Sequence, residues 1–89
     1  MDQRLKILRQ NIDNIDEKIL DLLEDRMNIV QEVGELKQEL DISVEDLNRE
    51  GKIIERLTQH SSGKLSEKQL IRIFTSVFKS SKQIQQSGK

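Results

Sequence analysis

The 89-residue sequence contains no cysteine, proline, tryptophan or tyrosine, and only two phenylalanines. Without cysteine the chain can form no disulfide and offers no thiolate ligand to a metal. So few aromatic residues, combined with 35% charged residues, are typical of long helices and helical bundles rather than of β-sheet proteins. The formal net charge is −1, and no run of Lys or Arg is interleaved with aromatic residues, so a nucleic-acid-binding surface is not indicated.

Other features are missing as well. No hydrophobic run approaches the length needed to cross a membrane, and MDQRLKILRQ at the N-terminus lacks the apolar segment of a signal peptide. We therefore expect a cytoplasmic protein with no membrane partner. A Gly-rich phosphate loop, a Ser-His-Asp arrangement and a second His to join His60 are all missing, so we expect no metal and no cofactor.

Hydrophobic residues recur at steps of three and four positions, which predicts helices over residues 2–40, 45–60 and 66–86 of a single all-α domain, 1–89. Capping boxes are expected at the starts of the second and third helices, from Ser43 with Asp46 and from Ser66 with Gln69. Gly63 is expected to end the second helix.

The first predicted helix is too long for a compact monomer. Residues 2–40 would span about 58 Å at a rise of about 1.5 Å per residue, whereas a compact chain of this size is roughly 30 Å across. About half of the helix must project, yet its apolar stripe continues along the whole length. We therefore expect a homodimer in which the long helices pack against each other, with a simple coiled coil as the alternative.

Polar side chains continue the apolar faces of all three predicted helices. In DRMNIVQEVGELK, residues 25–37, Arg26 and Lys37 fall within about 60° of Val30 and Val33 on a helical wheel. A surface helix normally carries its charges on the face opposite its apolar stripe. The corresponding inward positions of the other two helices hold Glu50, Ser81 and Gln85.

These inward charges need partners, because burying an unpaired charge costs several kcal/mol. Arg26 and Lys37 outnumber Glu50, and the surplus positive charge favours a pocket for a small anion that carries carboxylates. Two simpler interpretations stay open at this point. Arg26 and Glu50 could form a structural ion pair, and Gln85, near a helix end, could be solvated.

Three segments carry a family resemblance over nearly the whole chain: LRQNIDNIDEKILDLLEDRMNIVQEVGELK, DLNREGKIIERL and IFTSVFKSSKQIQ. They resemble the all-helical class of chorismate mutases (type II) in the leading LR, the DR pair, the Lys of GELK, the D-x-x-R-E segment and S-x-x-x-Q. The departures are Asn48 within D-x-x-R-E, the lack of a Pro before Val44, and a short loop at 61–64. The family fold is an intertwined homodimer of three-helix chains, which agrees with the length of the first helix.

The resemblance implies an isomerase that converts chorismate to prephenate by an intramolecular Claisen rearrangement, in the biosynthesis of Phe and Tyr. It implies five catalytic residues. Arg9 and Arg26 would bind the two substrate carboxylates, Lys37 and Gln85 would donate hydrogen bonds to the ether oxygen, and Glu50 would bind the ring hydroxyl.

The resemblance also implies three substrate-binding residues. Backbone near Asp46 would help Glu50, Ser81 would support a carboxylate, and Arg49 would add positive charge. Arg9 lies roughly 25 Å along the helix from Arg26, at about 1.5 Å per residue. In the family this leading Arg comes from the partner subunit, so the active site would be shared between two chains.

Three other functions remain open from the sequence. An isochorismate-pyruvate lyase shares the fold and much of the cation set. A regulatory domain fused to, or associated with, a 3-deoxy-arabino-heptulosonate-phosphate (DAHP) synthase could sense chorismate or prephenate. A helical dimerisation module without a ligand is the third.

Overall fold

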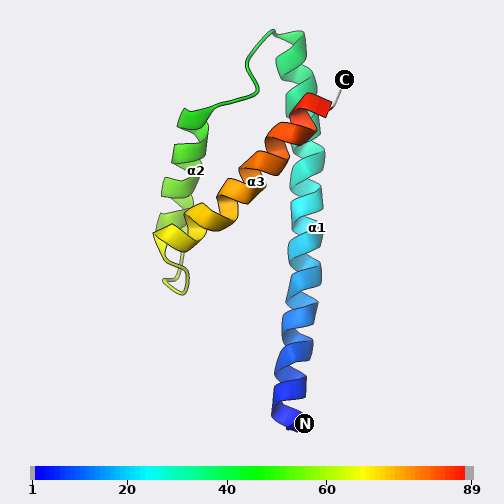
Figure 1. Ribbon diagram of the computed structural model, residues 1–89, viewed down its shortest axis with the longest axis vertical. Helices are drawn as coiled ribbons and strands as arrows, with labels where there is room; N and C mark the ends of the chain where they lie inside the picture. Colours follow the sequence, from blue (N-terminus) through cyan, green and yellow to red (C-terminus); the bar gives the residue numbers. More distant parts are fainter. Residues whose placement is uncertain (1, 88–89) are drawn as a thin grey trace.

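The computed structural model describes residues 2–87 and contains three α-helices (Figure 1). These are α1 (Gln3–Glu39), α2 (Leu47–His60) and α3 (Glu67–Ser87), and no strand occurs within the described range. The all-α prediction with a very long first helix is confirmed. The largest difference in helix bounds is at the start of α2, which begins at Leu47 rather than at 45. Positions 1, 88 and 89 of the predicted domain lie outside the described residues.

Helix α1 determines the shape of the chain. It runs along nearly the whole length of the molecule, while α2 and α3 lie beside its C-terminal half (Figure 1). The dimensions are 57 × 26 × 16 Å and the radius of gyration is 16.5 Å, against about 12 Å for a compact chain of this length. The N-terminal half of α1 therefore projects from the rest of the chain, as its predicted length required.

Local hydrogen bonds fix both ends of α1. The Asp2 carboxylate accepts a hydrogen bond of 2.8 Å from the Arg4 backbone N–H and caps the first turn. At the other end, the Ile42 N–H donates to the Lys37 carbonyl at 2.8 Å and the Asp41 N–H donates to the Gln38 carbonyl at 3.2 Å. Asp41 has a φ of 57°, so this is a Schellman motif with Asp in the position that glycine usually occupies.

Two of the predicted caps are wrong. Asp46, not Ser43, caps α2, because its carboxylate accepts a 2.9 Å hydrogen bond from the Arg49 N–H and the chain before it is not helical. Helix α2 ends at His60, and its C-cap Ser61 has an extended conformation; Gly63, with a φ of 98°, lies two positions beyond Ser61 in the connecting turn and is not the cap.

The predicted capping box at the start of α3 is confirmed. The Ser66 N–H donates to Gln69 Oε1 at 2.8 Å, and the Gln69 N–H donates to Ser66 Oγ at 3.2 Å.

Helix α3 is the centre of the small core. It packs against both α1 and α2, whose backbones do not approach each other closely within the described residues. Its buried apolar side chains are Leu70, Val77 and Phe78. On α2, Ile53 is the buried apolar side chain, whereas Leu47, at the start of the helix, is 67% exposed.

A row of large apolar side chains on α1 remains exposed in the single chain. Six of them follow the predicted stripe through the projecting half: Leu5, Leu8, Ile12, Ile15, Ile19 and Leu22. In the described part of the chain, no helix is both long and apolar enough to cross a membrane. The expected pairing of two long helices stays a prediction, and this exposed row is the surface that it requires.

Candidate active site

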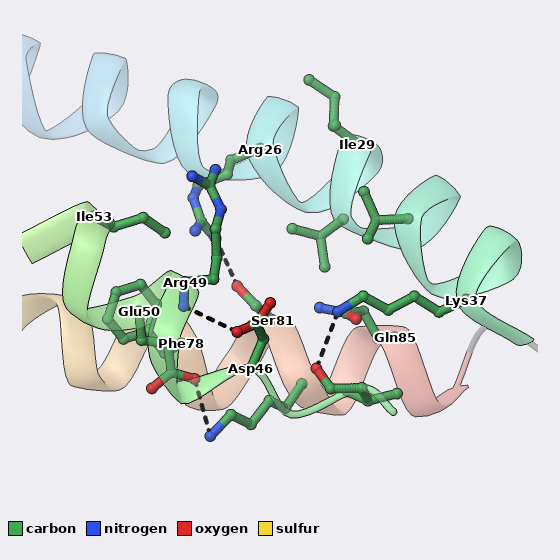
Figure 2. Close-up of a pocket in the computed structure, with 14 residues that line it drawn as sticks. Arg26, Ile29, Lys37, Asp46, Arg49, Glu50, Ile53, Phe78, Ser81 and Gln85 are labelled. Atoms are coloured by element: carbon green, nitrogen blue, oxygen red, sulfur yellow. Dashed lines mark hydrogen bonds and ion pairs between the residues drawn. The ribbon is translucent and has the colours of Figure 1, made fainter. Parts of the chain in front are cut away.

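A cavity of about 340 Å³ lies where α1 and α2 face each other across α3 (Figure 2). Its volume is at the small end of the usual range for small-molecule sites, about 300–1,000 Å³. Seven of the predicted site residues line it: Arg26, Lys37, Asp46, Arg49, Glu50, Ser81 and Gln85. Five of these seven, Arg26, Lys37, Glu50, Ser81 and Gln85, are the residues that the helical pattern places on the inward faces.

Two arginines lie together at one end of the cavity, Arg26 from α1 and Arg49 from α2 (Figure 2). Arg26 Nη1 donates a 2.6 Å hydrogen bond to Ser81 Oγ. The Ser81 hydroxyl is buried and donates to the Val77 carbonyl at 2.8 Å, so its oxygen is left to accept from Arg26. Burial, and secondarily the charge of Arg49, lower the pKa of the Arg26 guanidinium. Both causes indicate a positive charge that lacks compensation.

The other end of the cavity holds Lys37 and Gln85, whose side chains both turn into it (Figure 2). Lys37 Nζ donates to the Val44 carbonyl at 3.2 Å, which ties the last turn of α1 to the loop before α2. The Gln85 Oε1 atom is buried and has no hydrogen-bond partner within residues 2–87. An unsatisfied buried amide oxygen is unfavourable, and a buried Oε1 atom is not solvated, so the interpretation of Gln85 as a solvated end residue is wrong.

Glu50 forms an ion pair that the sequence did not predict. Its carboxylate lies 3.1 Å from Lys82 Nζ, which is also 3.6 Å from the Glu45 carboxylate. The hydrogen bond to Glu50 is the main cause that raises the pKa of Lys82. The suggested Arg26–Glu50 pair is therefore wrong, since each group has a different partner.

Lys82 was missed although the sequence held a signal for it. Four-residue steps along α3 from Phe74 through Phe78 reach Lys82, whereas the prediction followed the alternative steps to Ser81 and Gln85. Ile53, also missed, lines the cavity from α2.

Asp46 is engaged by α2 itself. Its carboxylate caps the helix through the Arg49 N–H, and its carbonyl accepts a 3.1 Å hydrogen bond from the Glu50 N–H. The residue therefore fixes the positions from which the Arg49 and Glu50 side chains enter the cavity.

Arg9 is the one predicted site residue that does not line the cavity. It is exposed on the projecting half of α1, roughly 25 Å along the helix from Arg26 at about 1.5 Å per residue. One chain cannot bring both guanidinium groups to one small molecule, so the expected contribution of Arg9 would require a second chain.

The charges of the cavity favour a small anion. Arg26, Lys37 and Arg49 form no ion pair with any carboxylate in the part of the chain that the structure describes, whereas Glu50 is neutralised by Lys82. No cluster of His, Asp or Glu side chains suited to a metal ion occurs among the described residues.

Three helices around a small cationic cavity define a class of all-helical proteins that bind a small anionic molecule. Within that class, the profile of the family described as chorismate mutase type II matches residues 8–86. The chain belongs to this family.

Similar structures agree over almost the full length. The crystal structure of chorismate mutase from Helicobacter pylori in complex with prephenate superimposes with a TM-score of 0.91 at 33% identity, covering 98% of this chain and 94% of that one. Form II of chorismate mutase from Thermus thermophilus gives a TM-score of 0.91 at 31% identity, covering 94% and 96% of the two chains.

Among curated relatives, chorismate mutase from Methanocaldococcus jannaschii is 39% identical over 57 residues, which are 64% of this chain and 58% of that protein. The chain thus matches just over half of this relative. It matches a far smaller share of the bifunctional chorismate mutase/prephenate dehydratases, 15% in the case of the Aquifex aeolicus protein.

Proposed function

We propose that this chain is an isomerase that converts chorismate to prephenate in aromatic amino-acid biosynthesis, as a cytoplasmic homodimer without metal or cofactor. The observation that carries the proposal is the cavity itself, in which Arg26, Lys37 and Arg49 form no ion pair within residues 2–87 and the Gln85 Oε1 atom is buried without a hydrogen-bond partner in the same range. Chorismate is a dicarboxylate, so it would supply the negative charge that these groups lack.

The arginine end of the cavity suits a carboxylate. A guanidinium can bind a carboxylate through two parallel hydrogen bonds, and Ser81 holds Arg26 in place through the 2.6 Å contact. Arg49, the second cation at this end, lowers the pKa of Arg26. A bound carboxylate would compensate both charges.

The Lys37–Gln85 end suits the oxygen on which charge develops. In the rearrangement a C–O bond breaks as a C–C bond forms within one molecule, and negative charge gathers on the ether oxygen. Lys37 is a charged donor, and a half-turn of the Gln85 amide exchanges its oxygen and nitrogen so that N–H groups face a ligand. Donors that are already oriented towards this oxygen stabilise the transition state more than the substrate.

Glu50 is the acceptor proposed for the ring hydroxyl. Its side chain is 23% exposed and is held by Lys82 at 3.1 Å, which leaves carboxylate lone pairs free to accept a further hydrogen bond. The cavity is also lined by the apolar side chains of Val30, Ile53 and Phe78, against which a folded substrate can pack. Holding the substrate in its reactive conformation lowers the barrier further.

The second carboxylate of the substrate would be bound by Arg9 of a second copy of this chain. The exposed apolar row on α1 offers the surface for pairing, and a partner running alongside would bring its own N-terminal half towards this cavity. The proposed active site is thus completed by dimerisation.

The test is to incubate the purified chain with chorismate, follow the loss of chorismate absorbance, and identify the product by mass spectrometry. Prephenate formation that is lost in Arg26→Ala supports the proposal. Salicylate and pyruvate formed from isochorismate would instead indicate the lyase. Chorismate binding without turnover would indicate a sensing domain, such as one associated with a DAHP synthase, and neither binding nor turnover would leave a structural module.

A further inference from the structure

Gly34 is the buried residue of α1 and lies directly against α3. A Cβ atom at this position would be 2.7 Å from the Gln85 Cα, 2.9 Å from the Gln85 carbonyl oxygen and 3.0 Å from the Gln85 Cβ. Carbon atoms in good contact are about 3.5–4.0 Å apart. Two of the three atoms belong to the backbone, so no rotation of a side chain could relieve the contact, and α1 and α3 would have to separate.

Glycine at position 34 destabilises α1 itself, since glycine is the weakest helix former after proline. Gly51, in α2, provides the comparison, because a Cβ there would meet nothing within 4 Å. The absence of a side chain therefore matters for packing at Gly34 and not at Gly51.

The position of this close approach connects it to the active site. Lys37 follows Gly34 by three residues and so lies on the same face of α1, while Gln85 is the residue that Gly34 contacts on α3. The two side chains that enter one end of the cavity, Lys37 and Gln85 (Figure 2), thus come from the close contact itself and from within one turn of it.

We propose that Gly34 is a positioning residue for catalysis: by having no side chain, it sets the spacing between the Lys37 ammonium and the Gln85 amide. This inference rests on the proposed function, in which both groups bind the same substrate oxygen. Relief of the contacts requires a separation of about 1 Å, and a misplacement of about 1 Å can cost roughly 10²-fold in rate.

The test compares Gly34→Ala with the matched variant Gly51→Ala. We expect kcat of Gly34→Ala to fall about 10²-fold with a much smaller change in KM, because the substrate carboxylates are bound by arginines and not by Lys37 or Gln85. Gly51→Ala should keep the wild-type kcat. Both changes favour the helix locally, so Tm should rise for Gly51→Ala. Tm should fall for Gly34→Ala, because the contact with Gln85 outweighs this local gain.

A double variant separates positioning from general damage. If Gly34→Ala acts through Gln85, adding it to Gln85→Ala should lower kcat little further, because the displaced group is already gone. Losses that multiply in the double variant, or a wild-type kcat in Gly34→Ala, would overturn the inference.

Gln85→Asn serves if Gly34→Ala does not fold, because it withdraws the amide by one methylene and leaves both backbones alone. It should lose kcat in the same way, and full activity would show that the spacing is unimportant. Absence of chorismate turnover in the wild type would refute the proposed function instead. The close packing of Gly34 against Gln85 would then be tested by the opposite Tm shifts of the two alanine variants and by a nuclear Overhauser contact between the Gly34 and Gln85 α-protons. Absence of that contact would overturn the inference.

Discussion

Arg26 shows at the scale of one residue why the cavity favours an anion. Its guanidinium is half-buried, its hydrogen-bond partner Ser81 is uncharged, and Arg49 is a second cation nearby. Burial and like charge both disfavour the ionised form, which is why its pKa is lowered. The charged arginine therefore makes the folded state less stable than it would otherwise be, and a bound carboxylate removes that penalty.

Gln85 offers a sharper test of the ether-oxygen contact than simple truncation. Gln85→Glu should be about 10²–10³-fold slower than the wild type at neutral pH, because an ionised carboxylate repels the developing negative charge where the amide donates to it. Activity should recover as the pH falls, since a protonated carboxyl can donate a hydrogen bond. The measurement is kcat against pH, with folding followed by circular dichroism at each pH.

The wild type is the control for this prediction, and it should gain nothing on acidification. A flat pH profile in folded Gln85→Glu, or wild-type activity at neutral pH, would mean that Gln85 does not touch the oxygen.

Lys82 should make stability depend on pH at the alkaline end. Its pKa is raised, chiefly by the hydrogen bond to Glu50. A lysine with a raised pKa stabilises the fold while it is protonated, and this stabilisation disappears as the pH rises through the folded-state pKa, which lies above the ordinary value of about 10.4. Lys82→Met should therefore be less stable than the wild type at pH 8, and the difference should shrink towards pH 11.

The measurement for Lys82 is chemical unfolding of both proteins at each pH. Lys79→Met, on an exposed position of the same helix, controls for the loss of one lysine charge. A difference between wild type and Lys82→Met that stays constant across this range would contradict the assigned ion pair.

Several site residues could be predicted from the sequence because each interrupts the apolar face of its own helix. This holds for Arg26, Lys37, Glu50, Ser81 and Gln85. The partners of these residues could not be predicted, because the Glu50–Lys82 pair and the Gly34–Gln85 contact depend on how close the helices approach. Periodicity gives the face on which a residue lies but not the distance to the facing helix.

At the scale of elements, α1 carries the strongest unexplained feature, its exposed apolar row. Ile15 is 54% exposed in the single chain. Substitution of such a residue in a monomer usually changes the unfolding free energy by no more than about 0.5 kcal/mol. If the row packs against a second copy, Ile15→Asn should instead cost at least about 2 kcal/mol.

Thermal unfolding at two protein concentrations checks this prediction. The wild-type midpoint should rise with concentration, because folding is coupled to association, while Ile15→Asn should unfold earlier and sediment as a smaller species. Glu17→Gln, about 160° away on the helical wheel, should behave like the wild type. A wild type that sediments as a folded monomer would contradict the pairing of α1.

The helices themselves were predictable because their signals are local: the three- and four-residue hydrophobic steps of α1 and the Ser66–Gln69 box of α3. The start of α2 was less so. Ser43 and Asp46 are both good N-caps by residue type. Asp46 is the cap in the structure, because the chain before it is extended and places the Val44 carbonyl against Lys37. That contact joins two segments and leaves no local signature.

At the scale of the whole molecule, the single chain exposes too much surface for its size. Its accessible area is 7460 Å², whereas a compact monomer of 10.4 kDa exposes about 5,400 Å². The excess is roughly 2,000 Å² per chain, or about 4,000 Å² for two chains, which lies within the total of about 2,000–5,000 Å² that obligate homodimer interfaces bury. Area and shape thus favour a dimer, in which the projecting half of α1 would be covered.

The central claim is that the cavity of one chain is completed by Arg9 of another, and mixing two inactive variants tests it most directly. Arg9→Ala and Arg26→Ala should each have almost no chorismate mutase activity alone. After the two proteins are mixed in equal amounts and allowed to exchange subunits, half of the dimers should be mixed, and each should contain one site with both arginines. The account predicts recovery of about one quarter of the wild-type activity. No recovery, with exchange demonstrated by mass spectrometry of the intact dimers, would contradict it.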